Sequence, residues 1–152
     1  MEDAEHKLQV LAEIAAALNE HQVLWAVGGS LLLYFHGKTD MFHDLDLMIA
    51  EQDAEQVKHL LEAMGSLAPK KPNPGYRTRG FLEFTIEQVE IDVMAGMVIV
   101  REGQEYDCSL QEDQIDGFRE VHGERIPLQK LSLWRRYYAL MGRDQKVAMI
   151  DG

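Results

Sequence analysis

One short segment constrains the fold of this chain more than any other. In it, Leu45, Leu47 and Ile49 alternate with Asp44 and Asp46. A period of two is typical of a β-strand, because successive side chains of a strand point to opposite faces. The segment therefore predicts a strand with one face in an apolar core and with both aspartates on its other face.

Helical spacing of apolar residues recurs in four further segments. These predicted helices cover residues 8–18, 54–64, 129–141 and 143–150. Apolar or β-rich runs between them are typical of strands. The predicted strands cover residues 23–27, 81–86 and 89–94, the last two as a hairpin, with several short ones between 97 and 126. This order of elements indicates an α/β (α+β) fold, in which helices cover a mixed β-sheet.

The chain has 152 residues, with no internal repeat and no low-complexity tract. A chain of this length removes roughly two thirds of its unfolded surface from water, which is ample for one core. We therefore expect a single domain over 1–152, of which 129–150 is a C-terminal helical segment. Three prolines between Pro69 and Gly75 predict an irregular loop there.

Charge and composition exclude several classes of protein. The chain has 26 acidic and 15 basic residues, a net charge of −11, so we expect no extended binding to nucleic-acid backbones, which requires clustered Lys and Arg. An acidic surface instead tolerates metal ions and cationic small molecules. A single cysteine, Cys108, excludes an intramolecular disulfide and a cysteine-rich zinc module.

No apolar run approaches the roughly 20 residues that a membrane-spanning helix needs. The first residues include Glu2, Asp3 and Glu5, whereas a secretory signal begins with basic residues. We therefore expect a cytoplasmic protein that does not enter a membrane.

A glycine turn follows the predicted strand over 23–27. Gly28 and Gly29 end this strand, and Ser30 is the expected N-cap of a short helix over 31–36. Such a turn offers main-chain N–H groups, a helix N-terminus and a hydroxyl group. All three suit the anionic oxygens of a phosphate group.

Three aspartates form the second candidate feature. Asp44 and Asp46 point the same way and repel each other, and their apolar neighbours limit hydration, so a divalent cation would relieve the repulsion. Asp92 lies on the polar side of the predicted strand over 89–94. A third carboxylate from an adjacent strand would complete an oxygen-rich site that suits Mg²⁺, an ion often shared with substrate phosphates.

The order of these motifs resembles that of the nucleotidyltransferase superfamily whose archetype is DNA polymerase beta. The resemblance rests on Val27-Gly28-Gly29-Ser30, then on Asp44-Leu45-Asp46-Leu47, and then on Ile91-Asp92-Val93. Within this superfamily, the chain looks like the small bacterial enzymes that adenylylate antibiotics, of the lincosamide or aminoglycoside type. It also resembles the nucleotidyltransferases of abortive-infection systems.

The resemblance implies a magnesium-dependent nucleotidyltransferase that moves a nucleoside monophosphate, AMP from ATP, to a hydroxyl group of a small-molecule acceptor. Asp44 and Asp46 would hold two Mg²⁺ ions, which lie roughly 3.5–4 Å apart in two-metal sites. Asp92 would bridge to the ion on the acceptor side and could help to deprotonate the attacking hydroxyl group.

The resemblance also implies a nucleotide-binding surface. The turn at Gly28, Gly29 and Ser30 would hold the β- and γ-phosphates, and pyrophosphate would leave. Lys146 or Arg143 would neutralise the triphosphate if the last helix folds back over the site.

Some features depart from the family pattern. Related enzymes usually carry an arginine shortly before the paired acids, whereas residues 37–43 contain none and Lys38 is the candidate substitute. This departure, with the irregular basic segment 143–146, motivates a second hypothesis. In it the chain is a catalytically degenerate or toxin–antitoxin-type module that binds or acts on a protein or RNA partner.

Other residues leave two interpretations open. His43 could tune the site or contact a base, or it could be a solvated loop residue. A basic patch could grip a phosphate or an acceptor, or could be a solvated loop; its members are Lys70, Lys71, Arg77 and Arg79. Because 152 residues leave little room for an acceptor domain, a homodimer or a partner chain could complete the acceptor site.

Overall fold

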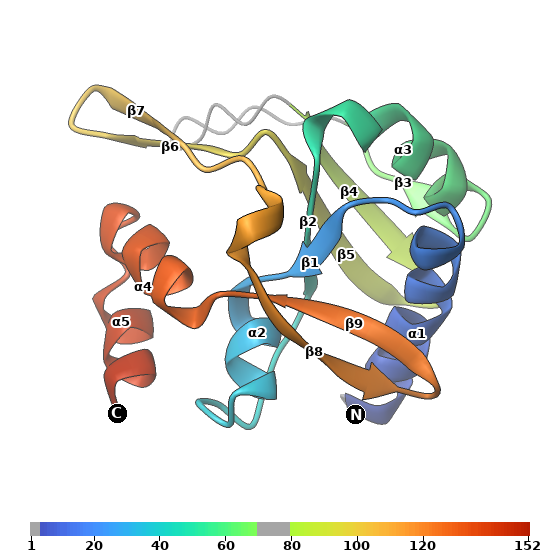
Figure 1. Ribbon diagram of the computed structural model, residues 1–152, viewed down its shortest axis with the longest axis horizontal. Helices are drawn as coiled ribbons and strands as arrows, with labels where there is room; N and C mark the ends of the chain where they lie inside the picture. The colour runs from blue at the N-terminus through green and yellow to red at the C-terminus, as the bar shows by residue number, and fades with distance from the viewer. Residues whose placement is uncertain (1–3, 70–79) are drawn as a thin grey trace.

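The structure is a computed structural model that describes residues 4–69 and 80–152. Its main sheet contains β1 (Trp25–Val27), β2 (Leu45–Ile49), β3 (Ser66–Leu67), β4 (Gly80–Ile86), β5 (Val89–Ala95), β8 (Ile115–Val121) and β9 (Glu124–Gln129). These strands are arranged in the order β3-β4-β5-β2-β1-β9-β8 (Figure 1). A separate hairpin consists of β6 (Val98–Arg101) and β7 (Gln104–Asp107). The mixed sheet with helices that the sequence predicts is therefore confirmed.

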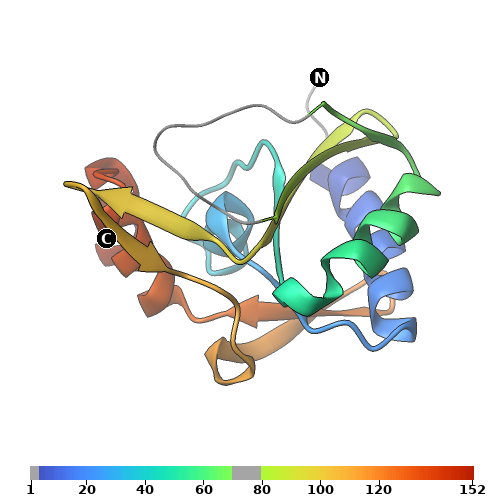
Figure 2. The ribbon, with the colours of Figure 1, turned by 90° about the horizontal axis from the view of Figure 1, so that it is seen from above.

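The described part of the chain contains five α-helices. They are α1 (Ala4–Glu20), α2 (Gly29–Phe35), α3 (Ala54–Glu62), α4 (Leu131–Leu140) and α5 (Asp144–Asp151). Single 3₁₀ turns cover Glu51–Asp53 and Glu112–Gln114. Figure 2 shows α1 and α3 on one side of β4 and β5, and α2 on the other. Helices α4 and α5 contact each other, and α4 also contacts α2 and β6.

β2 lies at the centre of the sheet, antiparallel to β1 and parallel to β5. Leu45 and Leu47 are completely buried, whereas Asp46 between them is half-buried. This confirms the alternation that the sequence predicts. β4 and β5 form the predicted hairpin, and Glu87 and Gln88 at its turn both have positive φ angles, of 48° and 71°.

The C-terminal third returns to the middle of the sheet. β9 pairs with β1 in parallel, with Val27 opposite Leu128. Since Gln129 still belongs to β9, the helix predicted from that residue begins at Leu131 instead. The parallel pairing places α4 and α5 next to the end of β1, where the glycine turn begins.

The prediction that Ser30 is the N-cap of the second helix is wrong. The N-cap is Gly28, and Ser30 is already the second residue of α2. Gly29 adopts a φ angle of 59°, a left-handed conformation that glycine reaches without steric cost. The chain therefore enters the helix one residue before Ser30, and the serine side chain is free for another role.

None of the described helices combines the length and the apolar character that crossing a membrane requires. Lys70, Lys71, Arg77 and Arg79 lie outside the described residues.

The central position of β2 predicts a large loss of stability when its core side chain is shortened. We expect Leu47→Ala to lower the free energy of unfolding by about 2–5 kcal/mol, because it leaves a cavity where a leucine is completely buried. Met41→Ala is the control, because Met41 is 72% exposed and its loss should cost less than about 0.5 kcal/mol. Urea unfolding measures both, and equal losses would contradict the placement of β2.

Candidate active site

Three aspartates meet on one face of two neighbouring strands. Asp44 directly precedes β2, Asp46 is the second residue of β2, and Asp92 lies opposite Asp46 in the parallel register with β5. Residues two apart on a strand share a face, and so do register partners on adjacent strands. The structure thus places on one face of the sheet the three carboxylates that the sequence singles out; among the described residues, the ligand atoms that all lie within 4.8 Å of one another are those of His43, Asp44 and Glu90 and not those of the three aspartates.

The carboxylates disturb one another electrostatically. Burial raises the pKa of Asp46 to about 8, and the negative charges of Asp92 and Asp44 add to this effect. Burial also raises the pKa of Asp92 to about 7, with further contributions from Asp44 and Glu83. Burial raises the pKa of Asp44 as well. The cluster resists full ionisation at neutral pH unless a positive charge compensates it.

The chemistry of this cluster fits a divalent cation. Asp44 Oδ1 is buried and accepts no hydrogen bond from the described part of the chain; His43 Nε2 lies 3.5 Å from it. A buried carboxylate oxygen without a partner is costly. Hard oxygen ligands are those that Mg²⁺ prefers. A cation would satisfy this oxygen and would offset the repulsion among the aspartates.

Glu90 and Glu83, which the sequence did not assign to the site, lie beside it, as does His43, for which the sequence leaves two interpretations open. His43 Nε2 lies 3.1 Å from Glu90 Oε2, and ligand atoms of His43, Asp44 and Glu90 all lie within 4.8 Å of one another. Glu90 precedes Asp92 by two residues, and Glu83 is the register partner of Asp92 on β4. Residues 90 and 92 are two apart on one strand and therefore share a face, so this spacing could have predicted Glu90 beside the site.

The glycine turn wraps around Asp46. The Gly28 N–H donates a hydrogen bond to the Asp46 main-chain oxygen, with a distance of 3.0 Å, and the Ser30 main-chain N–H donates one to the Asp46 carboxylate. A methyl group on Gly29 would overlap Asp46 Oδ2. Only glycine therefore allows the turn to approach this carboxylate so closely.

Helix α5 folds back onto the glycine turn. Lys146 Nζ donates a hydrogen bond of 3.0 Å to Ser30 Oγ. Partial burial and the charge of Arg143 lower the pKa of Lys146, whereas the charge of Asp46 opposes this shift. Arg143 itself lies over the ring of Tyr138, 5.6 Å from its centroid. The last helix thus folds back over the glycine turn, as a role of Lys146 in binding the triphosphate requires.

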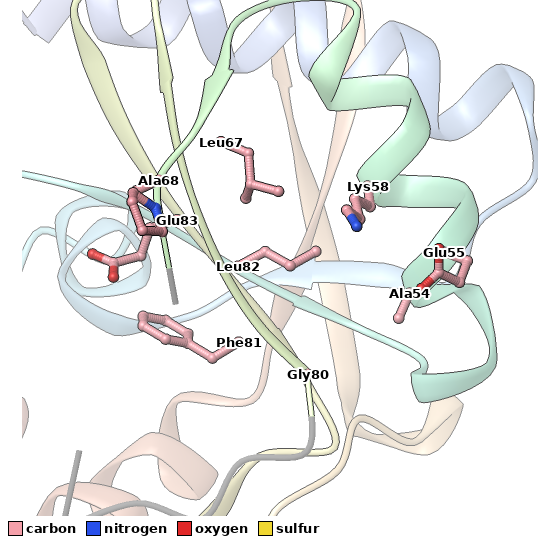
Figure 3. Close-up of a pocket in the computed structure, with 10 residues that line it drawn as sticks. Ala54, Glu55, Lys58, Leu67, Ala68, Gly80, Phe81, Leu82 and Glu83 are labelled. Carbon is pink, nitrogen blue, oxygen red and sulfur yellow. The ribbon is translucent and has the colours of Figure 1, made fainter. Parts of the chain in front are cut away.

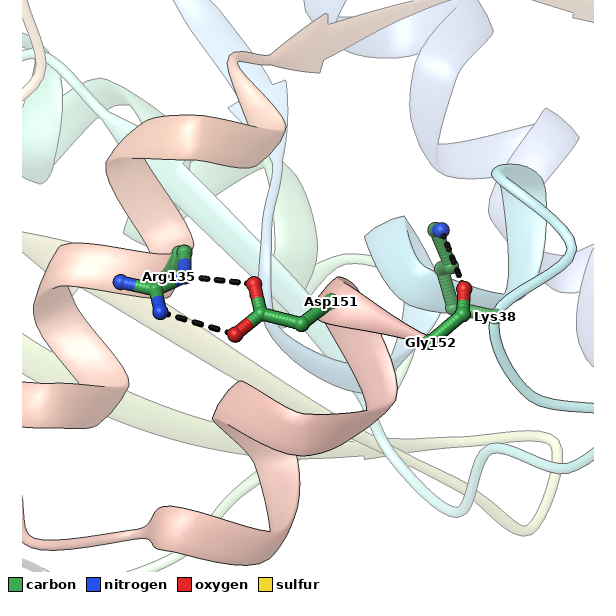
Figure 4. Close-up of polar contacts among 4 residues, drawn as sticks. All are labelled: Lys38, Arg135, Asp151 and Gly152. Atoms are coloured by element: carbon green, nitrogen blue, oxygen red, sulfur yellow. Dashed lines mark hydrogen bonds and ion pairs between the residues drawn. The ribbon is translucent and has the colours of Figure 1, made fainter.

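Polar contacts hold the far end of α5 in place. Arg135 of α4 donates two hydrogen bonds to the carboxylate of Asp151, of 2.6 and 2.8 Å (Figure 4). Lys38 Nζ donates a bond of 3.2 Å to the main-chain oxygen of Gly152. Lys38, the candidate substitute for the absent arginine, is therefore bound to the end of α5.

A separate pocket of about 350 Å³ lies between α3 and β4. In Figure 3, Leu67, Leu82 and Lys58 extend into the space between these elements, and Glu83, whose side chain points to the other side of β4, also lines the pocket. Glu83 is the register partner of Asp92, and register partners share a face of the sheet. The main part of this pocket thus lies across β4 from the aspartates.

The raised pKa of Asp46 predicts opposite effects of pH and of Mg²⁺ on stability. Its folded-state pKa of about 8 lies above the unfolded value of roughly 3.9, so its contribution to stability is complete below about pH 4 and is lost as the pH rises through 8. We expect Asp46→Asn to melt at a higher temperature than the original protein at pH 8.5 without metal.

Magnesium should reverse this order. At about 100 times its Kd, Mg²⁺ should raise the free energy of unfolding of the original protein by about 2.7 kcal/mol, and that of Asp46→Asn by much less. Thermal unfolding with and without Mg²⁺ measures both effects. Asp116→Asn, at an exposed position on β8, is the control. Equal shifts by Mg²⁺ in all three proteins would contradict the site.

Similar solved structures share this fold. A Thermotoga maritima protein assigned as a nucleotidyltransferase is 23% identical, with a TM-score of 0.78, and the match covers 99% of this chain and 93% of that one. ANT(2'')-Ia, solved in complex with adenylyl-2''-tobramycin, is 10% identical with a TM-score of 0.60, and the match covers 96% and 95%.

A third similar structure is the lincosamide antibiotic adenylyltransferase LnuA with bound lincomycin. It is 16% identical, has a TM-score of 0.61, and the match covers 93% of this chain and 94% of that one. A search of curated protein sequences finds no match. The family model of aminoglycoside-2''-adenylyltransferase matches residues 10–147, which include the glycine turn, all three aspartates and Lys146. The chain therefore belongs to the aminoglycoside-2''-adenylyltransferase family and is a nucleotidyltransferase.

Proposed function

We propose that the protein transfers AMP from magnesium-bound ATP to a hydroxyl group of a cationic small molecule, with an aminoglycoside as the preferred class of acceptor. The observation that carries this proposal is the convergence of three aspartates and a glycine turn that Lys146 contacts. Family membership supports the general reaction, and the arrangement of residues supports the assignment of their roles.

Asp44, Asp46 and Asp92 would hold magnesium. When bound, the cations would stabilise the negative charge that develops on the attacking and leaving oxygens during in-line displacement. The buried Asp44 oxygen, which accepts no hydrogen bond from the described residues, and the raised pKa values of Asp46 and Asp92 support this role, because a cation beside them would relieve both.

The glycine turn would bind the triphosphate. Ser30 Oγ accepts its hydrogen bond from Lys146, so a phosphate group at this position would meet an ammonium group and a hydroxyl group together. The charge of Lys146 would favour the β- and γ-phosphates, which leave as pyrophosphate. Arg143 lies beside Lys146 and adds positive charge to the same region.

The transfer exchanges one phosphorus–oxygen bond for another. The acceptor hydroxyl oxygen forms a bond to the α-phosphorus, and the bond from this phosphorus to the oxygen that bridges to the β-phosphate breaks. The electron pair of the broken bond leaves with pyrophosphate. Asp92 would accept the proton of the acceptor hydroxyl group, as a carboxylate positioned beside the attacking oxygen can.

The acceptor is proposed to be cationic because acidic side chains surround Asp92. Glu83 on the adjacent strand β4 is its register partner, and Glu90 precedes it by two residues on β5. Carboxylates near the attacking hydroxyl group would attract amino groups and would raise the local concentration of a polyamine. The family name, aminoglycoside-2''-adenylyltransferase, indicates an acceptor of this chemistry.

The second hypothesis, a degenerate module that binds a protein or RNA, has weaker support. An Asp92 side chain on the opposite face from Asp46 would favour it, whereas the two residues are register partners. The absence of an arginine from residues 37–43 remains its motivation, and an activity assay separates the two hypotheses.

We expect the protein to release pyrophosphate from MgATP in the presence of an aminoglycoside, which gains the mass of one adenylyl group. Asp92→Asn should lower kcat by about 10²–10⁴-fold, because it removes the proton acceptor. Asp116→Asn should leave kcat unchanged. Coupled pyrophosphate detection and mass spectrometry measure these outcomes. Unchanged turnover in Asp92→Asn would contradict the role of Asp92, and MgATP binding without turnover of any acceptor would favour the second hypothesis.

A further inference from the structure

The indole ring of Trp134 lies directly against Gly28. A Cβ atom on Gly28 would overlap Cζ2, Cε2 and Nε1 of this ring. Gly28 itself has an extended backbone, with φ of −135° and ψ of −161°, which any residue can adopt. The steric requirement for glycine at position 28 therefore comes from the tryptophan. At Gly29 the requirement differs, because its φ is 59° and Asp46 fills the adjacent space.

Buried hydrogen bonds fix the indole ring. Trp134 is 3% exposed, and its Nε1 donates a hydrogen bond of 2.7 Å to Gln129 Oε1. Gln129 is completely buried and donates from Nε2 to Gln114 Oε1, at 3.0 Å. A buried amide without partners would be costly. The ring therefore cannot move without leaving a buried polar group unpaired.

Aromatic packing holds the ring from its other side. The ring of Tyr137 lies at an edge-to-face angle of 76° to it, with centroids 5.3 Å apart. The ring of Tyr138 lies 5.4 Å from it. Arg143, at the start of α5, lies over the ring of Tyr138. The aromatic residues next to Gly28 therefore also contact the basic N-terminal end of α5.

We propose that Trp134, held by Gln129, is a positioning residue for the nucleotide: it forms a rigid wall that fixes Gly28 and thereby aligns Gly29 and Ser30 around Asp46. The proposal rests on the proposed function, since it assigns the glycine turn to ATP. The Gly28 N–H donates a hydrogen bond to the main-chain oxygen of Asp46, and the Ser30 N–H donates one to its carboxylate. A shift of Gly28 would therefore also move the turn relative to this carboxylate. Trp134 itself does not need to touch ATP.

The proposal predicts that positions 28 and 134 are coupled. Gly28→Ala alone should overlap the indole ring, displace the turn, lower the melting temperature and raise the KM for ATP more than it lowers kcat. Trp134→Phe removes the outer six-membered ring of the indole, which contains Cζ2, the atom nearest to the added Cβ. In the double variant, we expect Trp134→Phe to restore on the order of 10-fold in kcat/KM relative to Gly28→Ala alone.

Gly29→Ala is the matched control. Its added methyl group would overlap Asp46 and not the indole ring, and its backbone conformation disfavours alanine. We therefore expect no rescue of Gly29→Ala by Trp134→Phe. Rescue of both glycine variants alike would overturn the proposal, because it would show that Trp134→Phe only loosens the structure.

Fluorescence gives a readout that a general loss of stability would not move. The chain has two tryptophans, so Trp25→Phe leaves Trp134 as the single reporter. We expect Gly28→Ala to shift its emission in this variant even without nucleotide, because the added methyl group would overlap the indole ring, and Gly29→Ala to leave the emission unchanged. An emission that Gly28→Ala leaves unchanged would overturn the proposal, because it would show that Trp134 does not bound the turn at Gly28.

Failure of the proposed function and failure of this inference give different results. If the protein binds no nucleotide, the proposed function fails and the positioning role fails with it, while coupling of the melting temperatures still reports the steric contact. If the protein binds MgATP but the losses of Gly28→Ala and Trp134→Phe are additive in both melting temperature and KM, the inference alone is overturned.

Discussion

Repulsion among three partly buried aspartates is the constraint on which the arrangement of this protein depends. Leu45 and Leu47 fix β2 in the core, so Asp44 and Asp46 cannot turn away from each other, and the parallel pairing of β2 with β5 adds Asp92. The core thus holds in place a cluster of like charges that is unfavourable in the absence of a cation. The same rigidity prepares the cluster to bind one.

The rest of the site follows from the return of the chain to the middle of the sheet. β9 pairs with β1. Helices α4 and α5, which follow β9 near the C-terminus, therefore lie next to the glycine turn, which follows β1 near the N-terminus. One side of the turn is bounded by Asp46 and another by Trp134, while Lys146 contacts its serine. Each neighbour of the turn therefore comes from a different element, and the position of the turn depends on the whole fold.

Local patterns in the sequence predicted much of this structure. The period of two over residues 44–49 predicted the face of Asp44 and Asp46, and the β-rich runs on either side of Glu87 and Gln88 predicted the β4–β5 hairpin. These features depend on neighbouring residues alone. By contrast, Ser30 was assigned as the N-cap, because composition did not reveal that Gly29 would adopt a left-handed conformation.

Contacts between distant segments could not be predicted in the same way. The pairing of β1 with β9 joins Val27 to Leu128, and no local pattern encodes that partner. The contact of Gly28 with Trp134 and the hydrogen bond of Lys146 with Ser30 both follow from this pairing. The sequence named Lys146 only through its family resemblance, and the structure supplied the geometry.

We propose that Asp44, Asp46 and Asp92 bind divalent cations together beside the glycine turn. Anomalous diffraction from crystals grown with Mn²⁺ and a non-hydrolysable ATP analogue tests it most directly. We expect manganese bound by carboxylate oxygens of Asp44 and Asp46, with Asp92 as a ligand of at least one ion. Manganese bound only by His43, Asp44 and Glu90, or none near Asp46 and Asp92, would contradict it.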